Sequence, residues 1–126
     1  MKRMIPLLLS LLLLTGCGGN DANGSYEQIT QEAAKEMMDT QEVIILDVRE
    51  QDEYDSGHIP GAVLLPVGTI NEETASAVIP EKDDNVLVYC RSGNRSKTAS
   101  AALAGLGYTS IYEFGGINTW SYEIEQ

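Results

Sequence analysis

The feature that most constrains the fold is the alternation of short apolar runs with segments of helical spacing. Continuous apolar runs occupy positions 43–46, 62–65 and 86–89, and a further strand is predicted at 111–114. Strands that are apolar at every position are typical of a parallel sheet covered on both faces. Helices are predicted before, between and after these strands, at 31–38, 50–54, 70–79, 96–106 and near 118–122. The pattern predicts a single α/β domain with a mainly parallel sheet of about five strands, helices on both faces, and its active edge at the carboxyl ends of the strands.

Residues at the ends of the predicted helices support these boundaries. Thr30 and Asn71 are suited to N-cap positions, and Gly107 is suited to the position after a helix C-terminus. Apolar residues at helical spacing predict the buried faces of two helices: Ala33, Ala34, Met37 and Met38 in the first, and Ala99, Ala102, Leu103 and Leu106 in the segment 96–106.

The first residues are typical of an export signal rather than of the folded domain. A basic start is followed by an apolar stretch at 5–14, which is shorter than the roughly 20 residues needed to cross a bilayer. The segment Leu14-Thr15-Gly16-Cys17 resembles the lipobox of bacterial lipoproteins, in which Cys17 would be lipidated after cleavage. An ordinary signal peptide, or a membrane anchor in which Cys17 is incidental, are the alternatives. The expected organisation is a signal peptide at 1–16, a lipidated cysteine and flexible tether at 17–25, and a domain at 26–126, held outside the cytoplasm on a bacterial membrane.

The charge and the cysteine count narrow the function. Once Lys2 and Arg3 are removed with the signal, six basic and 19 acidic residues leave a net charge of −13. Such a surface repels nucleic acid, so no nucleic-acid partner is expected. About 100 residues support one core and no second domain, and a monomer is expected. If Cys17 carries lipid, Cys90 has no partner for a disulfide, and it is either a reactive thiol or a buried structural cysteine.

Cys90 directly follows a predicted strand and precedes a short polar loop, residues 91–95, that leads into a helix. Successive backbone N–H groups of such a loop can form an anion-binding nest, reinforced by the positive end of the helix dipole. Gly93 is the residue best able to adopt the positive φ that this curl requires. A cysteine in such surroundings has a pKa of about 3.5–7.5 instead of about 8.5. The single histidine, His58, is therefore not needed as a partner base.

Three motifs, in order, carry a family resemblance: DVREQDEYDSGHIPGAVLLP, VLVYCRSGNRS and GYTSIYEFGGINTW. Together they resemble the rhodanese family of sulfurtransferases, and the similarity extends from about Tyr26 to about Tyr122. The resemblance implies that the Cys90 thiolate attacks the outer sulfur of a donor such as thiosulfate, that sulfite departs, and that a Cys90 persulfide passes its sulfur to a thiol or to cyanide. No metal and no organic cofactor are implied.

The length of the loop favours sulfur over phosphorus as the atom attacked. Cysteine phosphatases, including those that share the rhodanese fold, have five residues between cysteine and arginine, and their loop encloses a tetrahedral phosphate. Here only four residues separate Cys90 from Arg95, so the cup is tighter. Two alternatives remain: a phosphatase or arsenate reductase on the same fold, and a lipid-tethered sulfur-relay or binding module without turnover of its own.

The other residues of these motifs also have expected roles. Arg91 is expected to attract the anionic donor, with a solvated loop charge as the alternative; Arg95 either pairs with an acid, steadies the loop or contacts substrate. Ser92, Gly93 and Asn94 are expected to supply backbone N–H groups to the substrate. Asp47 and Arg49 are expected to form an ion pair or loop brace, with a part in catalysis as the alternative. His58 is expected to be part of a turn, and Phe114 and Trp120 are expected to be core residues.

Overall fold

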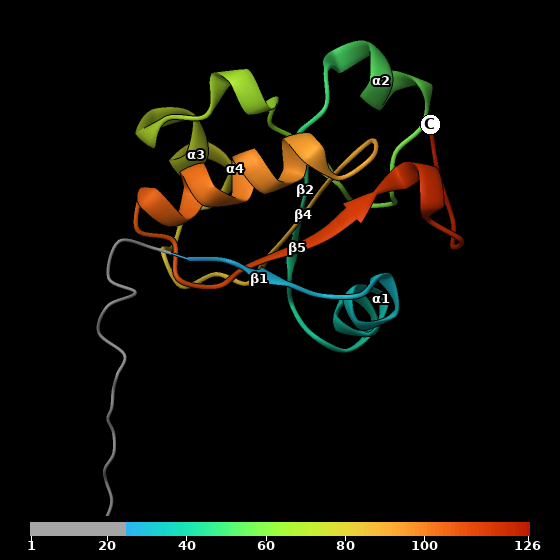
Figure 1. Cartoon of the computed structure of the whole chain (residues 1–126), viewed down its shortest axis with the longest axis horizontal. Coiled ribbons are helices and arrows are strands. Elements are labelled where there is room, and N and C mark those ends of the chain that lie inside the picture. The colour runs from blue at the N-terminus through green and yellow to red at the C-terminus, as the bar shows by residue number, and fades with distance from the viewer. Residues whose placement is uncertain (1–24) are drawn as a thin grey trace, which may run out of the picture.

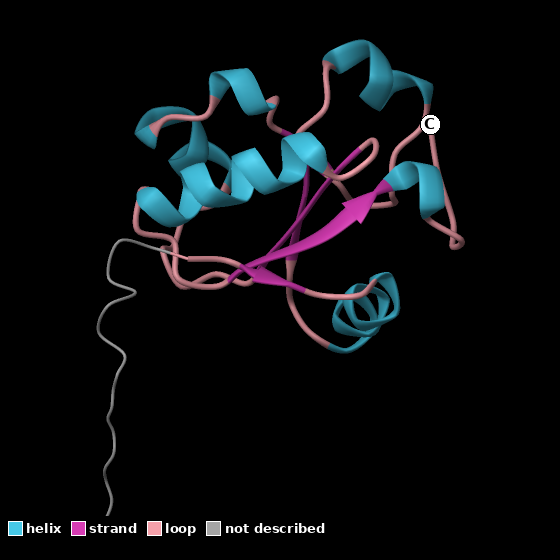
Figure 2. Ribbon diagram, viewed as in Figure 1, coloured by secondary structure: helices cyan, strands magenta, loops and turns pink. Residues whose placement is uncertain are grey.

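A five-stranded sheet, parallel throughout, forms the centre of the computed structural model, which describes residues 25–126 (Figures 1 and 2). The strands lie in the order β1-β5-β4-β2-β3 and all four pairings are parallel. The strand bounds are β1 Glu27–Gln28, β2 Ile44–Asp47, β3 Val63–Leu64, β4 Val86–Cys90 and β5 Ile111–Gly116. The predicted α/β class and parallel sheet are confirmed.

Helices cover the sheet from both sides: α3 and α4 lie on one face and α1 lies on the other (Figure 1). The helical bounds are α1 Gln31–Thr40, α2 Gln51–Ser56, α3 Glu72–Val78 and α4 Asn94–Gly105, with short 3₁₀ turns η2 Val67–Thr69 and η3 Ile117–Thr119. Within residues 25–126, none of these helices is both long enough and apolar enough to cross a membrane.

The predicted helix ends are confirmed by their caps. The Thr30 side chain accepts a hydrogen bond from the backbone N–H of Ala33, and the Asn71 side chain accepts one from that of Thr74. Gly107 follows the end of α4 with a φ of 103°, a conformation that a residue with a Cβ rarely adopts. These local contacts fix where α1, α3 and α4 begin or end, and so where the loops between them run.

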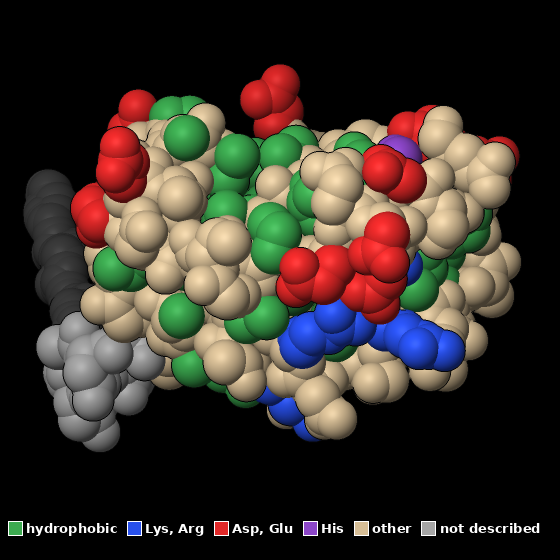
Figure 3. All heavy atoms as spheres, turned by 90° about the horizontal axis from the view of Figure 1, so that it is seen from above, with side chains coloured by type: hydrophobic (Ala, Val, Ile, Leu, Met, Phe, Trp, Pro, Cys, Tyr) green, Lys and Arg blue, Asp and Glu red, His purple; other side chains and the backbone are tan. Residues whose placement is uncertain are grey.

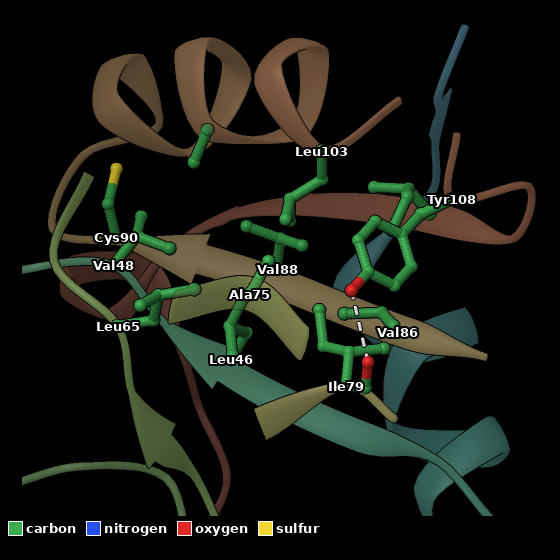
Figure 4. Packing of buried hydrophobic residues seen from close by; sticks show 12 residues of the cluster. Leu46, Val48, Leu65, Ala75, Ile79, Val86, Val88, Cys90, Leu103 and Tyr108 are labelled. Carbon is green, nitrogen blue, oxygen red and sulfur yellow. Dashed lines mark hydrogen bonds between the residues drawn. The ribbon is translucent and has the colours of Figure 1, made fainter. Parts of the chain in front are cut away.

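Two apolar cores lie on the two faces of the sheet. Figure 4 shows the first core, in which Val86 and Val88 of β4 pack beneath Leu103 of α4, and the sulfur of Cys90 lies at one end, directed toward α4. The second core lies under α1 and contains Tyr89, Phe114 and Trp120, so the core positions predicted for Phe114 and Trp120 are confirmed. Because side chains alternate along β4, Tyr89 and Cys90 face opposite cores.

Several local predictions were wrong. The two-residue strand β1 was not predicted, because its exposed Glu27 and Gln28 give no apolar signal. The strand predicted at 62–65 is reduced to Val63–Leu64, since it is an edge strand that pairs only with β2. Ala102 is exposed, and the buried face of α4 instead consists of Ser96, Ala99, Ser100, Leu103 and Ala104.

The signal segment and Cys17 lie outside the described residues, so these predictions are not tested by the structure.

Candidate active site

Cys90 is the last residue of β4 and stands at the carboxyl edge of the sheet, between β2 and β5. Its side chain is almost fully buried, with 1% of the residue exposed, and it is a free cysteine. The short loop 91–93 follows it, and α4 begins at Asn94. The strand therefore delivers the sulfur directly to the amino end of a twelve-residue helix, where the helix dipole favours negative charge.

Backbone N–H groups of the loop face the sulfur of Cys90. The N–H of Gly93 donates to Sγ at 3.1 Å, and the N–H groups of Ser92 and Ser96 also act on it. Gly93 has a φ of 110°, so the positive φ predicted for this residue is confirmed. Because a residue with a Cβ rarely adopts that conformation, the glycine is what allows the loop to curl around the sulfur.

The surroundings of Cys90 favour its thiolate. Burial by itself raises the pKa of the thiol, but hydrogen bonds from the Ser96 hydroxyl and from the backbone N–H groups of Ser96, Gly93 and Ser92 outweigh it, and the pKa lies below its ordinary value. A thiolate stabilised in this way is the reactive form in nucleophilic chemistry. His58 is not among the groups that lower the pKa of Cys90.

The carboxyl end of β5 contacts the active-site loop and supports it. The backbone N–H of Asn118 donates to the carbonyl of Arg91 at 3.1 Å. Gly116 pairs with Cys90 across a local bulge in the sheet. A Cβ on Gly116 would lie 2.1 Å from the carbonyl oxygen of Arg91 and 2.7 Å from the Cα of Ser92. Only glycine permits this close approach, so Gly116 helps to set the position of the loop.

Arg95 is engaged by an acid from another element. Its guanidinium donates two hydrogen bonds to the Glu53 carboxylate of α2, at 2.8 and 2.9 Å. This pair joins the first turn of α4 to α2 and agrees with the sequence-based alternative in which Arg95 pairs with an acid. This contact uses one N–H from each of two guanidinium nitrogens and braces the start of α4 against α2.

Replacing Glu53 with glutamine is expected to remove part of the protein's sensitivity to acid. Arg95 holds the pKa of Glu53 at about 2, below its ordinary 4.5. Because the pKa is lower in the folded state, the pair stabilises the fold fully above about pH 4.5 and is lost as the pH falls toward 2. Since Arg95 and Glu53 are partly exposed, the contribution should be about 1 kcal/mol.

Urea unfolding of wild type and of the Glu53→Gln variant, at neutral pH and near the folded pKa, measures this contribution. The wild-type advantage in unfolding free energy should shrink at the lower pH. Glu27→Gln, the same change at an exposed position of β1, serves as the control. An advantage of equal size at both pH values would show that the ion pair does not titrate in this range.

Arg91 differs from Arg95 because its side chain is exposed. Within residues 25–126, no acidic side chain forms an ion pair with it. On the face viewed in Figure 3, basic side chains gather in one place beside a group of acidic ones, and other acidic side chains stand apart from it. Arg91 is thus an exposed cation at the loop of an acidic chain, and it is available to an anion.

Asp47 and Arg49 form a buried pair at the carboxyl end of β2. The Arg49 guanidinium donates to Asp47 at 2.9 and 2.7 Å and to the carbonyl of Gly57 at 2.7 Å. Tyr89 donates its hydroxyl to Asp47 at 2.6 Å. Since Tyr89 and Cys90 face opposite sides of the sheet, this network braces the sheet edge and does not reach the sulfur.

The contacts of His58 are with a neighbouring aromatic ring and with the backbone. Its ring stacks on Tyr54 with centroids 3.8 Å apart, and Nδ1 lies 2.9 Å from the carbonyl oxygen of Tyr54. Its backbone pairs with Glu125 near the C-terminus. These contacts agree with the structural role expected for His58 and tie the turn after α2 to the end of the chain.

Three residues near Cys90 were not singled out from the sequence: Ser96, Glu113 and Gly116. Ser96 is fully buried in the first turn of α4, and its hydroxyl lies 3.4 Å from the Cys90 sulfur. Glu113 is 2% exposed although it carries a carboxylate. An acidic residue inside a predicted buried strand was the available signal, and it was not used.

A hollow of about 380 Å³ lies beside the loop, and its lining includes Gln31, Ser92, Gly93 and Lys97. Cys90 does not line it, so the hollow is not a direct entrance to the sulfur. Among residues 25–126 there is also no group of three or more histidine, cysteine, aspartate or glutamate side chains placed to bind a metal. The chemistry supported by the side chains themselves is that of a nucleophilic thiolate in an anion-binding loop.

Comparison with known proteins gives this arrangement a family. The Rhodanese-like domain family model matches residues 30–123. A putative mitochondrial thiosulfate sulfurtransferase of Schizosaccharomyces pombe is 42% identical over 93 residues, covering 65% of this chain and 66% of that protein. Thiosulfate sulfurtransferase GlpE of Coxiella burnetii is 34% identical over 96 residues, covering 75% of this chain and 87% of that protein.

Solved structures agree with the sequence relatives. An Escherichia coli rhodanese determined with anions superposes with a TM-score of 0.61 at 33% identity, covering 68% of this chain and 99% of that one. A rhodanese-related protein from Thermoplasma volcanium gives a TM-score of 0.67 at 30% identity, covering 79% of this chain and 98% of that one. With the family match, the parallel sheet and the cysteine loop at its edge, this chain belongs to the rhodanese-like domain family.

Proposed function

We propose that this protein is a sulfurtransferase that moves a sulfane sulfur from a thiosulfate-like donor to a thiophilic acceptor through a Cys90 persulfide. The observation that carries the proposal is the buried sulfur of Cys90, which accepts a 3.1 Å hydrogen bond from the N–H of Gly93 at the start of α4. Relatives named thiosulfate sulfurtransferase, at 34% and 42% identity, support the same assignment.

In the first step the Cys90 thiolate attacks the outer sulfur of thiosulfate. Its electron pair forms a new S–S bond, the S–S bond of thiosulfate breaks, and that bond's electron pair leaves with sulfite. The negative charge stays on the outer sulfur of the Cys90 persulfide. N–H groups at the start of a helix stabilise such an anion in place, without a metal and without a proton donor.

In the second step the acceptor takes the outer sulfur. The nucleophilic atom of cyanide or of a thiolate attacks it, the persulfide S–S bond breaks, and the electron pair returns to Cys90 as the thiolate. Arg91 is the exposed cation at the loop, and we assign it the attraction of the anionic donor. Asn94 and Arg95 are the first residues of α4, and the Arg95 side chain pairs with Glu53.

Two alternative functions make different predictions. A phosphatase or arsenate reductase needs a loop that encloses a tetrahedral oxyanion, and the four residues between Cys90 and Arg95 make a smaller cup. A relay module would accept sulfur at Cys90 and release it only to a dedicated partner. The first differs in the atom attacked, and the second differs in whether small acceptors sustain turnover.

Parallel assays of the full chain separate these functions. With thiosulfate and cyanide we expect repeated turnover to thiocyanate and sulfite, and with an aryl phosphate or arsenate we expect no reaction above background. Turnover of the phosphate ester without thiocyanate formation would contradict sulfur transfer. A single equivalent of thiocyanate per protein would favour the relay module.

We also propose that the domain is anchored through a lipid on Cys17, which lies outside the described residues. The lipobox-like segment ending at Cys17 supports this. In a bacterial host, wild type should fractionate with membranes and incorporate labelled fatty acid, and Cys17→Ser should do neither. Label on the Cys17→Ser variant would assign the anchor to another residue.

A further inference from the structure

Two basic side chains in residues 25–126 form no ion pair, and both lie at or next to the active-site loop. Arginine and lysine occur six times in this part of the chain. Four of these side chains pair with acids: Lys35, Arg49, Lys82 and Arg95. The other two, Arg91 in the loop and Lys97 in the first turn of α4, are exposed. On a chain with 19 acidic residues, the cations that remain available to a ligand are therefore those near Cys90.

Lys97 and Arg91 serve different spaces. Lys97 lines the hollow of about 380 Å³ beside the loop, together with Ser92 and Gly93, and Arg91 does not line it. A hollow of this volume is large enough for a small organic molecule. The loop therefore has a second binding space next to it, with a cation of its own.

The side chain of Gln31 adds hydrogen-bonding capacity to this hollow. Its amide nitrogen donates to the carbonyl of Gly116 at 2.9 Å and to the hydroxyl of Thr119 at 3.1 Å. These contacts fix the orientation of the amide, and among residues 25–126 no donor bonds to its oxygen, Oε1. An amide oxygen of this kind can accept a hydrogen bond from a peptide N–H. A cation together with this acceptor fits a ligand that has a peptide bond and a carboxylate.

The hollow also has an acidic residue, Glu113, but its carboxylate is engaged by the protein. Only 2% of Glu113 is exposed. One carboxylate oxygen accepts from the amide of Gln28 at 3.1 Å, and the other accepts from the N–H of Gly115 at 2.9 Å and from the hydroxyl of Ser96. Because Lys97 is exposed and Glu113 is not, an anionic group that enters from solvent meets the lysine.

The sulfur donor does not account for this hollow. The outer sulfur of thiosulfate must meet the sulfur of Cys90, and Cys90 does not line the hollow. Thiosulfate is a small anion without a chain that could extend from the loop into a neighbouring space. An acceptor thiol must also meet the sulfur on Cys90, but it can carry a longer body. The hollow can therefore distinguish one acceptor from another by the part that lies beyond the thiol.

We infer that the hollow is the acceptor subsite, in which Lys97 binds the carboxylate of a peptide-like thiol while that thiol reaches the Cys90 persulfide. The inference rests on the sulfur transfer proposed for Cys90 and names the class of its acceptor. The acceptor thiolate attacks the outer sulfur, the persulfide S–S bond breaks, and its electron pair returns to Cys90. The acceptor leaves as a persulfide that carries the negative charge. Lys97 binds away from the reacting atoms and is a specificity-determining residue.

Two acceptors that differ only in their terminal group test the role of Lys97. They are N-acetyl-cysteinylglycine, which has a carboxylate, and its amide, which has none. The full chain is loaded with thiosulfate, freed of excess donor and mixed with each thiol at low salt, and intact mass follows the loss of sulfur from Cys90. Lys97→Gln should lower the acid-to-amide rate ratio about threefold, the size expected for one exposed ion pair, and Lys97→Glu should lower it further. A ratio that is unchanged in Lys97→Gln would overturn the inference.

Lys82→Gln is the matched control, because it removes the same charge at the other end of α4, where Lys82 donates to the carbonyl of Leu106 at 2.9 Å. This variant should keep the wild-type ratio. An equal fall in Lys82→Gln and Lys97→Gln would show a general effect of net charge and contradict the subsite. A fall in Arg91→Gln but not in Lys97→Gln would place the carboxylate at the loop instead. Discharge by cyanide but by neither peptide thiol would exclude this class of acceptor.

Binding can also be measured without any sulfur transfer. The S-methyl derivatives of the two thiols cannot accept sulfur, and NMR titration of the resting full chain reports where they bind. The acid derivative should shift the backbone amide signals of Gly93 and Lys97 and the side-chain amide of Gln31, and the amide derivative should shift them less. The absence of shifts at all three groups would overturn the subsite. Because no donor is used, this result and the result for sulfur transfer can fail separately.

Discussion

Replacement of Cys90 with serine is expected to abolish sulfur transfer while the domain stays folded. A serine hydroxyl in the same amide cup is neither ionised at neutral pH nor able to form a persulfide. Losses on the order of 10³-fold or more are usual when a nucleophile is removed. Serine closely matches cysteine in shape, and the N–H of Gly93, which contacts the sulfur at 3.1 Å, would still find an acceptor. Thiocyanate formation measures the activity, and thermal unfolding checks the fold.

The matched control is Cys17→Ser, which makes the same chemical change at the chain's other cysteine. Because Cys17 lies before the domain that carries the loop, this variant should transfer sulfur at the wild-type rate. Wild-type activity in a folded Cys90→Ser variant would remove Cys90 from the mechanism. Loss of activity in both variants would point instead to a need for both cysteines.

Replacement of Gly116 with alanine is expected to disable the site without touching any reacting atom. The added Cβ would lie 2.1 Å from the carbonyl oxygen and 2.4 Å from the carbonyl carbon of Arg91, both backbone atoms of the active-site loop. Either the loop or the end of β5 must move. Displacements of about 1 Å at a reacting centre can cost about 10²-fold in rate. Overpacking of this kind also destabilises a domain by about 1–3 kcal/mol.

Gly105→Ala is the control, since a Cβ at Gly105, the last residue of α4, meets nothing within 4 Å. Alanine is the better helix former, so this variant should be as stable as wild type or slightly more stable. Thiocyanate formation and urea unfolding of both variants separate the effect of the loop from that of a lost glycine. Full activity in Gly116→Ala would mean that the end of β5 does not set the position of the loop.

The strand, loop and helix around Cys90 could be predicted because their signals are local. An apolar run ends at Cys90, Gly93 permits the curl, and the helix follows at once. The helix caps at Thr30 and Asn71 could also be predicted, because each side chain bonds to a backbone N–H only three positions away. Each of these features depends on contacts within a few positions of the chain, which is the range over which sequence patterns are informative.

The residues that β5 and α2 contribute around Cys90 could not be predicted in this way. Glu113 and Gly116 reach Cys90 only because β5 pairs with β4 in the sheet. The partner of Arg95 is Glu53, which is 42 positions earlier in the chain and comes close through the packing of α2. Sequence reasoning left the role of Arg95 open among three possibilities, and only the tertiary arrangement showed that its guanidinium pairs with Glu53.

The central claim is that a Cys90 thiolate, held by loop amides, accepts a second sulfur. Intact mass spectrometry of the full chain tests it most directly. Exposure to thiosulfate should add the mass of one sulfur atom, a peptide map should place it on Cys90, and cyanide should remove it. A mass that stays unchanged after thiosulfate and after other sulfane donors, in protein whose Cys90 is reduced and reactive, would contradict sulfur transfer by this residue.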